Sequence, residues 1–301
     1  MQQKIIDIKS ISELNDVYGY EKPKHPLISA IDLAKVSGQK VQADTMYRVH
    51  FYSVYLKTTK GAIKYGKAYY DFDEATLIFT APYQTISSNS NIELEQGWCL
   101  AFHSDLLNRT ELGKTIGNYS FFNYDANEAL HVSEDEKNTL ENCIENIKKE
   151  YGQNIDQHTQ GLIVNNIELF LNYCTRFYNR QFITRAKINN DIVQRFEHLL
   201  KTHFSQETLI EIGLPDVKYF AAKLSLSPNY LSDLLQKYTG KSTQEHIHLQ
   251  LVEKAKTLLW STNKSVSEIA FDLGFEYPSH FTKIFKNKTG TSPLEFRQSI
   301  N

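Results

Sequence analysis

The chain of 301 residues has few cysteines and no long apolar run. Its three cysteines, Cys99, Cys143 and Cys174, are odd in number and far apart. This spacing argues against a disulfide framework and a cysteine-rich zinc site, so we expect buried thiols that pack as small apolar groups. The sequence also lacks a stretch of about 18 apolar residues and a charged start followed by a hydrophobic segment. We therefore expect a cytoplasmic protein with no membrane association.

The sequence also lacks the residue patterns of common enzymes. It contains no nucleophile motif, phosphate-binding loop or paired-carboxylate signature. A cupin-type metal enzyme needs a close pair of histidines with a glutamate and a further histidine, so that three or four ligands converge on one ion. His25, His50 and His103 are isolated, and His246 and His248 lie in a predicted helix where positions two apart diverge. We therefore expect no catalytic residues, no metal and no cofactor.

Charge is distributed unevenly along the chain. The net charge is −2 at pH 7, yet residues 217–301 carry 11 Lys or Arg against 7 Asp or Glu, whereas the preceding 216 residues carry 22 against 28. The mild positive bias of the last third fits a polyanionic partner such as DNA, and the earlier part has no electrostatic reason to contact one. At this length, two folded domains are the natural expectation.

The last third of the chain repeats itself. Three apolar positions that begin at Val217 recur 49 positions later, and five further positions that begin at Leu231 recur 50 positions later. The offset changes by one residue between Leu224 and Leu231, so one copy has an inserted residue there. A surface turn between two short helices accepts such an insertion, whereas packed helices do not. The repeat therefore predicts two copies of helix, tight turn and helix.

The second helix of each copy carries the residues suited to DNA. These helices open at Ser227-Pro228 and around Pro278, with Ser227 as a side-chain cap. Their outward positions are mostly hydrogen-bonding and uncharged or basic, as a helix in a DNA groove requires; for each, the alternative is a solvated surface residue. The predicted DNA-binding residues are Asn229, Ser232, Asp233, Gln236 and Lys237 in the first copy and Ser279, His280, Thr282, Lys283 and Lys286 in the second.

A third kind of helix is predicted between the copies. It starts at a Ser-x-x-Glu capping box at 242–245 and keeps an apolar face from Ile247 up to Trp260. A helix of roughly 17 residues spans about 25 Å. A rod of that length holds the two outward helices about one duplex turn apart. A second capping box at 265–268 begins the next helix.

Together these features resemble AraC-type transcription regulators. The signature positions are Ala270 to Phe275, Ser279 to Phe281, Phe285, Lys286, Gly290, Ser292, Pro293 and Arg297, with Ala255, Leu258 and Leu259 for the linker helix. The likeness covers about 100 residues, from near Ile192 to the C-terminus. The resemblance implies two helix-turn-helix modules in adjacent major grooves, double-stranded promoter DNA and RNA polymerase as partners, and more often activation than repression.

The first 130 residues predict many short strands. β-Branched and aromatic residues alternate over 47–56 and 64–72, and short apolar runs follow at 75–79 and 98–102. Such a pattern favours a barrel or jelly roll, and the resembled family commonly has a cupin-like sensor barrel. A barrel mouth suits a small-molecule effector; the alternative is that its aromatic residues only fill the core. The candidate pocket residues are Tyr47, His50, Tyr52 and Tyr70.

Two longer helices are predicted between the strands and the repeats. A capping box at 133–136 starts the first, and the second runs from about Ile155 to Gln181 with more apolar residues than one side of an isolated helix needs. Helices at this place commonly pair subunits in the resembled family, which implies a homodimer. The alternative is that the helix packs onto its own barrel.

The expected fold class is α+β. It comprises a cupin-like sensor barrel at 1–130, a helical dimerisation segment and linker at 131–185, and an all-α DNA-binding domain with two helix-turn-helix modules at 186–301. The expected function is sequence-specific regulation of transcription, as an activator, with an N-terminal domain that senses an effector or dimerises. One alternative is an effector-independent regulator that uses the barrel only for dimerisation. The other, a cupin-type metal enzyme, is disfavoured by the histidine spacing.

Overall fold

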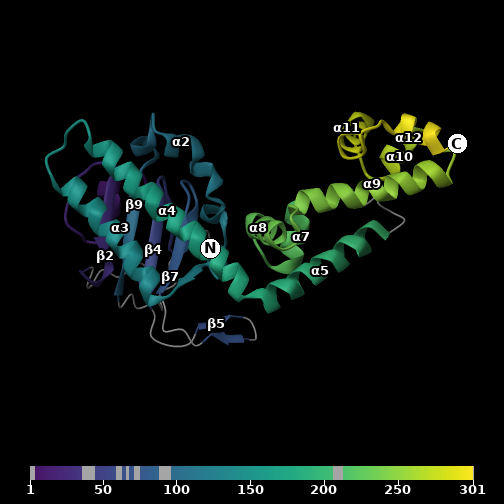
Figure 1. The fold of residues 1–301 in the computed structure, drawn as a ribbon. Coiled ribbons are helices and arrows are strands. Elements are labelled where there is room, and N and C mark those ends of the chain that lie inside the picture. The colour runs from purple at the N-terminus through teal and green to yellow at the C-terminus, as the bar shows by residue number, and fades with distance from the viewer. Residues whose placement is uncertain are drawn as a thin grey trace. The chain divides into compact units, whose positions relative to one another are not determined.

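A computed structural model describes residues 4–35, 45–58, 63–65, 68–70, 75–87, 96–205 and 213–300. The chain divides into two compact units, Met1–Thr184 and Arg185–Asn301 (Figure 1). Each unit has its own hydrophobic core, and each is described by itself below.

A five-stranded antiparallel sheet forms the centre of the first unit. Its strand order is β10 (Leu130–Val132), β7 (Ala75–Thr80), β4 (Tyr52–Thr58), β9 (Gln96–Phe102) and β2 (Ile28–Asp32). Because side chains alternate across a strand, the sheet contributes to a separate core on each face. Val54 and Leu56 enter one core and Tyr55 enters the other.

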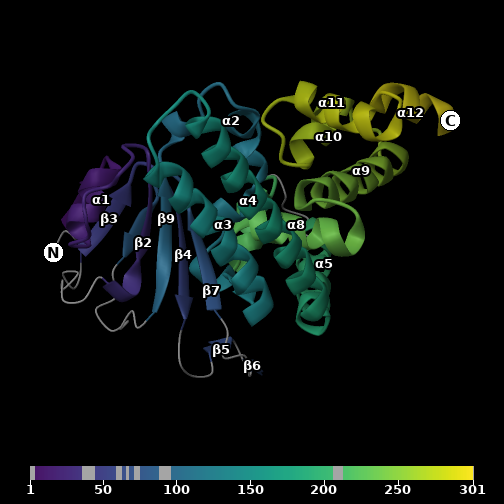
Figure 2. The ribbon, with the colours of Figure 1, turned by 60° about the vertical axis from the view of Figure 1, so that its left-hand side comes forward.

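Two long helices cover one face of this sheet. These are α3 (Glu134–Gly152) and α4 (Thr159–Thr184), whose ribbons lie along the sheet in Figure 2. The predicted capping box starts α3: the backbone N–H of Glu136 donates to Ser133 Oγ, and that of Ser133 donates to the Glu136 carboxylate. The inward side chains of both helices, among them Ile144 and Phe170, share one core with the sheet.

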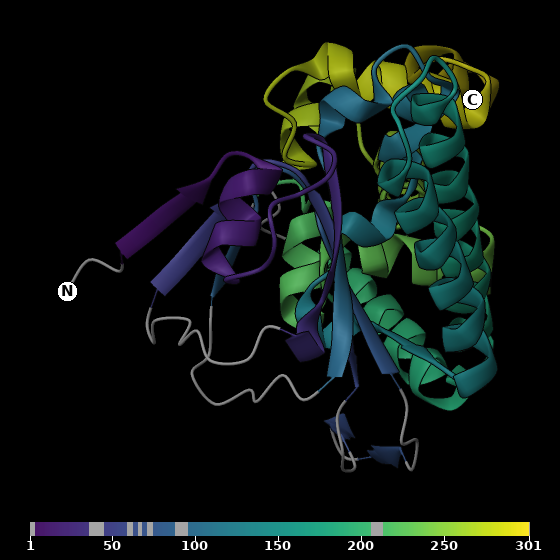
Figure 3. The same ribbon diagram turned by 90° about the vertical axis from the view of Figure 1, so that its left-hand side faces the viewer.

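The opposite face carries a short helix and a second sheet (Figure 3). Helix α1 (Ile11–Val17) and the three-stranded sheet of β1 (Lys4–Ile8), β3 (Thr45–Val49) and β8 (Thr85–Ser87) lie there. Strands β5 (Ile63–Tyr65) and β6 (Ala68–Tyr70) form a third sheet, and α2 (Glu111–Thr115) follows β9. The mixed class of helix and sheet is confirmed. Within the described ranges, however, the strands form three sheets without closing a barrel, so the cupin-like barrel stays a prediction.

The cysteines agree with the sequence expectation. Cys99, Cys143 and Cys174 are free and buried, as predicted. Burial raises the pKa of the Cys99 thiol to about 12, so this side chain stays protonated and unreactive at neutral pH. Of the helices in the described part of the chain, none is both long enough and apolar enough to cross a membrane.

The described part of the second unit is all-helical, and each copy of its repeat contains a long helix in addition to the predicted pair. Helix α5 (Ala186–Ser205) packs against the pair α7 (Val217–Leu224) and α8 (Pro228–Thr239). Helix α9 (Thr243–Ser261) packs in the same way against α10 (Val266–Asp272) and α11 (Pro278–Thr289), and α12 (Pro293–Ile300) closes the end. The buried residues Phe196, Leu200 and Phe204 of α5 recur 51 positions later as Ile247, Leu251 and Ala255 of α9.

The ends of these helices form where the sequence predicts them. The capping boxes at Ser242 and Ser265 are both present, and Ser227 Oγ accepts the N–H of Tyr230 at the start of α8. Between the helices of the two pairs, the chain turns through a left-handed residue, Ser225 with φ 58° and Gly274 with φ 85°. The two positions are 49 apart, so the turn geometry repeats along with the sequence, and glycine adopts it without steric cost.

Candidate nucleic-acid interface

Helix α8 buries one side and exposes the other. Leu231, Leu234 and Leu235 are fully buried, whereas the predicted DNA-binding residues Gln236 and Lys237 are exposed. The Gln236 side-chain amide donates to the Gly240 carbonyl oxygen at 3.0 Å, which leaves its own carbonyl and one N–H group for another partner.

The other three predicted residues of α8 are half-buried: Asn229, Ser232 and Asp233. The Ser232 hydroxyl donates to Thr243 Oγ1 at 3.1 Å, and Thr243 is fully buried. Ser232 thus joins α8 to the start of α9, a role that differs both from a DNA contact and from the solvated surface position that the sequence left open. Gln236 and Lys237 are the most accessible of the five.

Helix α11 presents a wider exposed face than α8. Phe281 and Phe285 are fully buried in the core of the unit. The predicted residues Ser279, His280, Lys283 and Lys286 are exposed, and Thr282 is half-buried with its hydroxyl donating to the Pro278 carbonyl oxygen at 3.1 Å. Spacings of three and four residues place Ser279, Thr282, Lys283 and Lys286 on one face of the helix; His280 lies on its flank.

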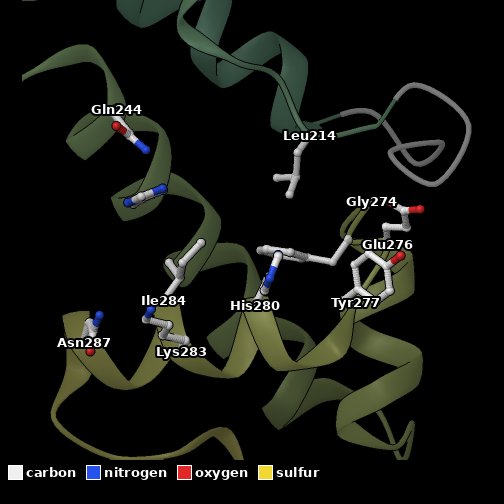
Figure 4. A pocket seen from close by; sticks show the side chains of 11 residues that line it. Leu214, Gln244, Gly274, Glu276, Tyr277, His280, Lys283, Ile284 and Asn287 are labelled. Atoms are coloured by element: carbon white, nitrogen blue, oxygen red, sulfur yellow. The ribbon is translucent and has the colours of Figure 1, made fainter.

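A cleft of about 510 Å³ runs beside α11 (Figure 4). It lies between α9 and the turn that precedes α11, with Leu214 on its other side, and His280 and Tyr277 form part of its wall. His280 stands 50 positions after Tyr230, which is only 5% exposed in the first copy. The cleft thus occurs where the second copy has a smaller, exposed side chain.

The sequence prediction missed several residues of this cleft. They are Leu214, Gln244, His248, Glu276, Tyr277, Ile284 and Asn287. The signal that could have found them is the difference between the copies, since an aromatic residue in one copy is replaced by histidine in the other. Burial lowers the pKa of His248, so its ring is uncharged at neutral pH and adds hydrogen-bonding capacity rather than charge.

Comparisons with known proteins assign this region. A model described as a helix-turn-helix domain matches residues 220–299. The regulatory protein PocR of Salmonella typhimurium is 35% identical over 91 residues, which is 30% of this chain and 29% of PocR. The transcriptional activator RhaS of Klebsiella pneumoniae is 34% identical over 99 residues, 33% of each chain. Residues 220–299 of the second unit match an AraC-type helix-turn-helix domain, and this unit is called the AraC-type domain below.

The likeness to known proteins is confined to part of their length. The first relatives are matched over only 29% to 41% of their own chains. Among solved structures, the C-terminal domain of AraT, a response regulator from Geobacillus stearothermophilus, is 31% identical to this chain. That comparison covers 36% of this chain and 84% of the other, with a TM-score of 0.32.

The AraC-type domain carries exposed lysines on its two second helices. Lys237, Lys283 and Lys286 form no ion pair with any residue in the described ranges. Other lysines of the domain are neutralised: Lys264 lies 2.6 Å from Asp272, and Lys256 lies 2.7 Å from Glu253. Lysines on other helices, among them Lys218 and Lys223 of α7, also lack an ion pair within the described ranges. On α8 and α11 the unpaired lysines stand beside exposed side chains that can form hydrogen bonds, as a surface for phosphates and base edges requires.

Of the four candidate effector residues, the three whose side chains the structure describes do not share one site. Tyr47 packs with the core on the α1 side of the sheet, whereas Tyr52 stacks on Phe102 at 5.3 Å in the core on the helix side. His50 Nε2 lies 2.9 Å from Asp7 Oδ1. Tyr70 lies in β6, and its side chain falls outside the described part of the structure.

The separation of Tyr47 and Tyr52 has a simple cause. The predicted strand of residues 47–56 is two strands, because the chain leaves the three-stranded sheet after Val49 and enters the five-stranded sheet at Tyr52. Within the three-stranded sheet, Asp7 of β1 accepts two hydrogen bonds from the guanidinium of Arg48 in β3, at 2.7 and 2.8 Å. These bonds, with that to His50, hold the pKa of the Asp7 carboxyl well below its usual range.

Proposed function

We propose that this chain is a transcription regulator that binds double-stranded promoter DNA in a sequence-specific manner. The observation that carries the proposal is the pairing of an AraC-type domain with two second helices, α8 and α11, whose exposed residues are hydrogen-bond donors and unpaired lysines. In this proposal α7–α8 and α10–α11 are two helix-turn-helix modules, and their second helices enter successive major grooves.

The chemistry of the exposed side chains suggests different roles for them. A glutamine amide matches the adenine edge and a lysine matches the guanine edge, so we assign base reading to Gln236 and Lys283. Lys237 and Lys286 would contact phosphates. Helix α9 has 19 residues and spans about 28 Å, which suits modules that bind about one duplex turn apart, roughly 34 Å.

Alanine substitutions at Gln236 and Lys283 test this assignment. Gln236→Ala and Lys283→Ala should each weaken specific DNA binding by about 1 to 3 kcal/mol, because each removes one base contact. Both side chains are exposed, so the melting temperature should not change. Fluorescence anisotropy with a labelled promoter fragment measures the binding, and differential scanning fluorimetry measures the stability.

Two exposed residues of α5 provide matched controls. Gln194→Ala and Lys201→Ala remove the same chemical groups from another helix of the domain, and both should leave specific binding within about twofold of wild type, roughly 0.4 kcal/mol. If the control variants lose as much affinity as Gln236→Ala and Lys283→Ala, the base-reading assignment to α8 and α11 is wrong.

We further propose that the first unit senses a small molecule or dimerises, and that the protein activates transcription with RNA polymerase as partner. The similarity to RhaS, a transcriptional activator, supports activation as the sign of regulation. A regulator that needs no effector is the alternative. A cupin-type metal enzyme is not supported: in the described ranges, no cluster of three or more His, Cys, Asp or Glu side chains is placed to hold a metal.

Two exposed leucines of α4 are the candidates for the interface of the proposed homodimer. Most apolar side chains of α4 pack into the unit's own core, including Ile167, Phe170 and Cys174. Leu162 and Leu169 do not: each is 45% exposed, and their spacing of seven residues places them on the same face, two turns apart. We propose that this pair of leucines lies at the centre of a dimer interface.

Charge placed on the two leucines should separate the subunits. The double variant Leu162→Glu, Leu169→Glu should be monomeric at micromolar concentration, because two carboxylates from each subunit would be buried in the interface. The charge-matched control Thr175→Glu, Asn179→Glu alters exposed residues on the other flank of α4 and should stay dimeric. Multi-angle light scattering gives the mass; a monomeric wild-type protein, with or without DNA, would contradict the dimer.

A further inference from the structure

Helix α11 begins without a side-chain cap. Tyr277 is its N-cap residue, and the tyrosine side chain makes no capping hydrogen bond. Within residues 213–300, all of which the structure describes, α7, α8, α9, α10 and α12 each begin at a serine or aspartate whose side-chain oxygen accepts a backbone N–H. Such caps stabilise the start of a helix. The sequence therefore forgoes a local stabilisation at one of the two helices to which we assign base contacts.

The first copy of the repeat shows the capping residue that the second copy lacks. Tyr277 stands 50 positions after Ser227, which is 3% exposed and whose Oγ accepts the N–H of Tyr230 at 3.2 Å. In the second copy the equivalent N–H, that of His280, donates to the Tyr277 carbonyl oxygen at 3.0 Å. The Tyr277 side chain takes no part in this bond, and the residue is 56% exposed. A small, buried capping residue is thus replaced by a large, exposed aromatic one.

The Tyr277 ring lies beside residues already assigned to DNA. Its centroid is 5.8 Å from that of the His280 ring. Tyr277, His280 and Lys283 all line the cleft beside α11 (Figure 4), so the ring lies on the same side of the helix as the lysine assigned to guanine. A recognition helix contacts base edges through its N-terminal residues. Tyr277 immediately precedes the first of these residues in α11.

The chemistry of the ring decides which base it fits. Most of the surface of a tyrosine ring is apolar, and the major groove presents hydrogen-bond donors, acceptors and one apolar group, the C5-methyl of thymine. Covering a methyl group with the ring is favourable, whereas covering a donor or acceptor that the ring cannot pair with is unfavourable. The base that suits an exposed aromatic ring in this groove is therefore thymine.

We infer that Tyr277 is a specificity-determining residue whose ring contacts the C5-methyl of a thymine. This inference rests on the proposed DNA-binding function and adds one base to the recognised sequence. Six residues of chain separate Tyr277 from Lys283. Six helical residues span about 9 Å, which is the length of roughly three base pairs. The recognised sequence therefore contains a thymine within about three base pairs of the guanine that Lys283 contacts.

Replacement of thymine by deoxyuridine tests the contact, because it removes the methyl group and leaves base pairing unchanged. Genomic fragments selected by the full-length protein supply the duplex, which is synthesised with deoxyuridine at one thymine at a time. At one thymine, within about three base pairs of the position where Lys283→Ala loses its base preference, wild-type binding should weaken about fourfold, equivalent to about 0.8 kcal/mol for one buried methyl group. Fluorescence anisotropy measures the affinities.

Two substitutions of Tyr277 assign the effect to its ring. Tyr277→Ser places the capping residue of the first copy in the second, so its melting temperature should equal or exceed that of wild type. It should bind the thymine duplex about tenfold more weakly, because about 50 Å² of apolar ring surface is no longer buried, and it should no longer distinguish thymine from deoxyuridine. Tyr277→Phe lacks only the hydroxyl and should keep the preference for thymine, which separates a methyl contact from a phosphate contact.

Trp260→Ser is the matched control. It removes another exposed aromatic ring of the same domain, 72% exposed near the end of α9, and should keep both the affinity and the preference for thymine. A lower melting temperature of Tyr277→Ser would instead show that the tyrosine has a structural role.

Other results also overturn the inference. These are the absence of a sensitive thymine in the expected range, a thymine preference that persists in Tyr277→Ser, and loss of that preference in Tyr277→Phe or Trp260→Ser. If any of them occurs while the wild-type protein binds its selected duplex, the proposed DNA binding stands and Tyr277 contacts no thymine. If the wild-type protein selects no genomic DNA, the DNA-binding proposal fails and this inference fails with it.

Discussion

Replacing Phe285 with alanine should lower the free energy of unfolding of the AraC-type domain by about 3 to 5 kcal/mol, the usual cost of removing a fully buried aromatic ring. Phe285 is 0% exposed, and its ring centroid lies 5.8 Å from that of Phe281 and 5.5 Å from that of Phe296. The side chain therefore holds α11 against α12 as well as against the core. Urea denaturation followed by circular dichroism measures the change.

The loss of DNA binding in this variant should differ in kind from that of the surface variants. Phe285→Ala loosens the helix that carries Lys283 and Lys286, so binding should fall together with stability. Lys283→Ala should reduce binding alone, and it serves as the matched control on the same helix. If Phe285→Ala costs less than about 1 kcal/mol of unfolding free energy, the core of the domain is not packed as described.

The second large effect is expected at Phe170, in the core of the first unit. Phe170→Ala should also cost about 3 to 5 kcal/mol, because the ring is 0% exposed and packs edge-on against Trp98 at 5.8 Å between centroids. The variant should move the Trp98 emission to longer wavelength as water reaches the indole. Fluorescence of a Trp260→Phe background, in which Trp98 is the only tryptophan, follows this transition during urea denaturation.

The two core variants test whether the units unfold independently. Because each unit has its own core, Phe170→Ala should lower the stability of the first unit while the AraC-type domain keeps its DNA affinity, and Phe285→Ala should do the reverse. Multidomain chains often unfold in separate steps. If both variants lower the Trp98 transition and DNA binding equally, the chain behaves as one cooperative unit and this division is incorrect.

The features that the sequence predicted well are local ones. The capping boxes at Ser133, Ser242 and Ser265 depend on residues three apart, and each is present. The helical pairs depend on periodic apolar positions and on a turn that repeats at Ser225 and Gly274. Short-range chemistry decides all of these, so one chain suffices to identify them.

Strand pairing in the first unit depends on contacts that the sequence does not display. Residues 4–8 pair in parallel with residues 45–49, and nothing in either segment specifies the other. The transfer of the chain from one sheet to another between Val49 and Tyr52 is equally hidden, since alternation continues across it. The predicted pocket residues were therefore distributed over two cores. The participation of α5 in the repeat was missed because its match to α9 is mainly in burial: Leu200 and Leu251 are the same residue type, but Phe196 and Phe204 correspond to Ile247 and Ala255.

The candidate interface was predictable in outline but not in detail. Helical periodicity separated the outward from the inward positions of α8 and α11, and Gln236, Lys237, Lys283 and Lys286 are indeed exposed. It could not show that Ser232 bonds to Thr243, because that contact joins two helices. The cleft beside His280 likewise depends on how three segments meet, and the sequence signal that could have indicated it is the difference between His280 and Tyr230 of the first copy.

Binding of the full-length protein to DNA as a function of salt tests the central claim most directly. Fragments of the source organism's own genome are selected by the protein at low salt, and the affinity for a selected fragment is measured from about 50 to 200 mM salt. We predict retention of specific fragments, a linear fall of log affinity with log salt, and a slope that becomes shallower by about one in Lys286→Ala, because one phosphate contact is lost. If correctly folded protein retains no genomic DNA at low salt, the chain does not bind DNA through α8 and α11.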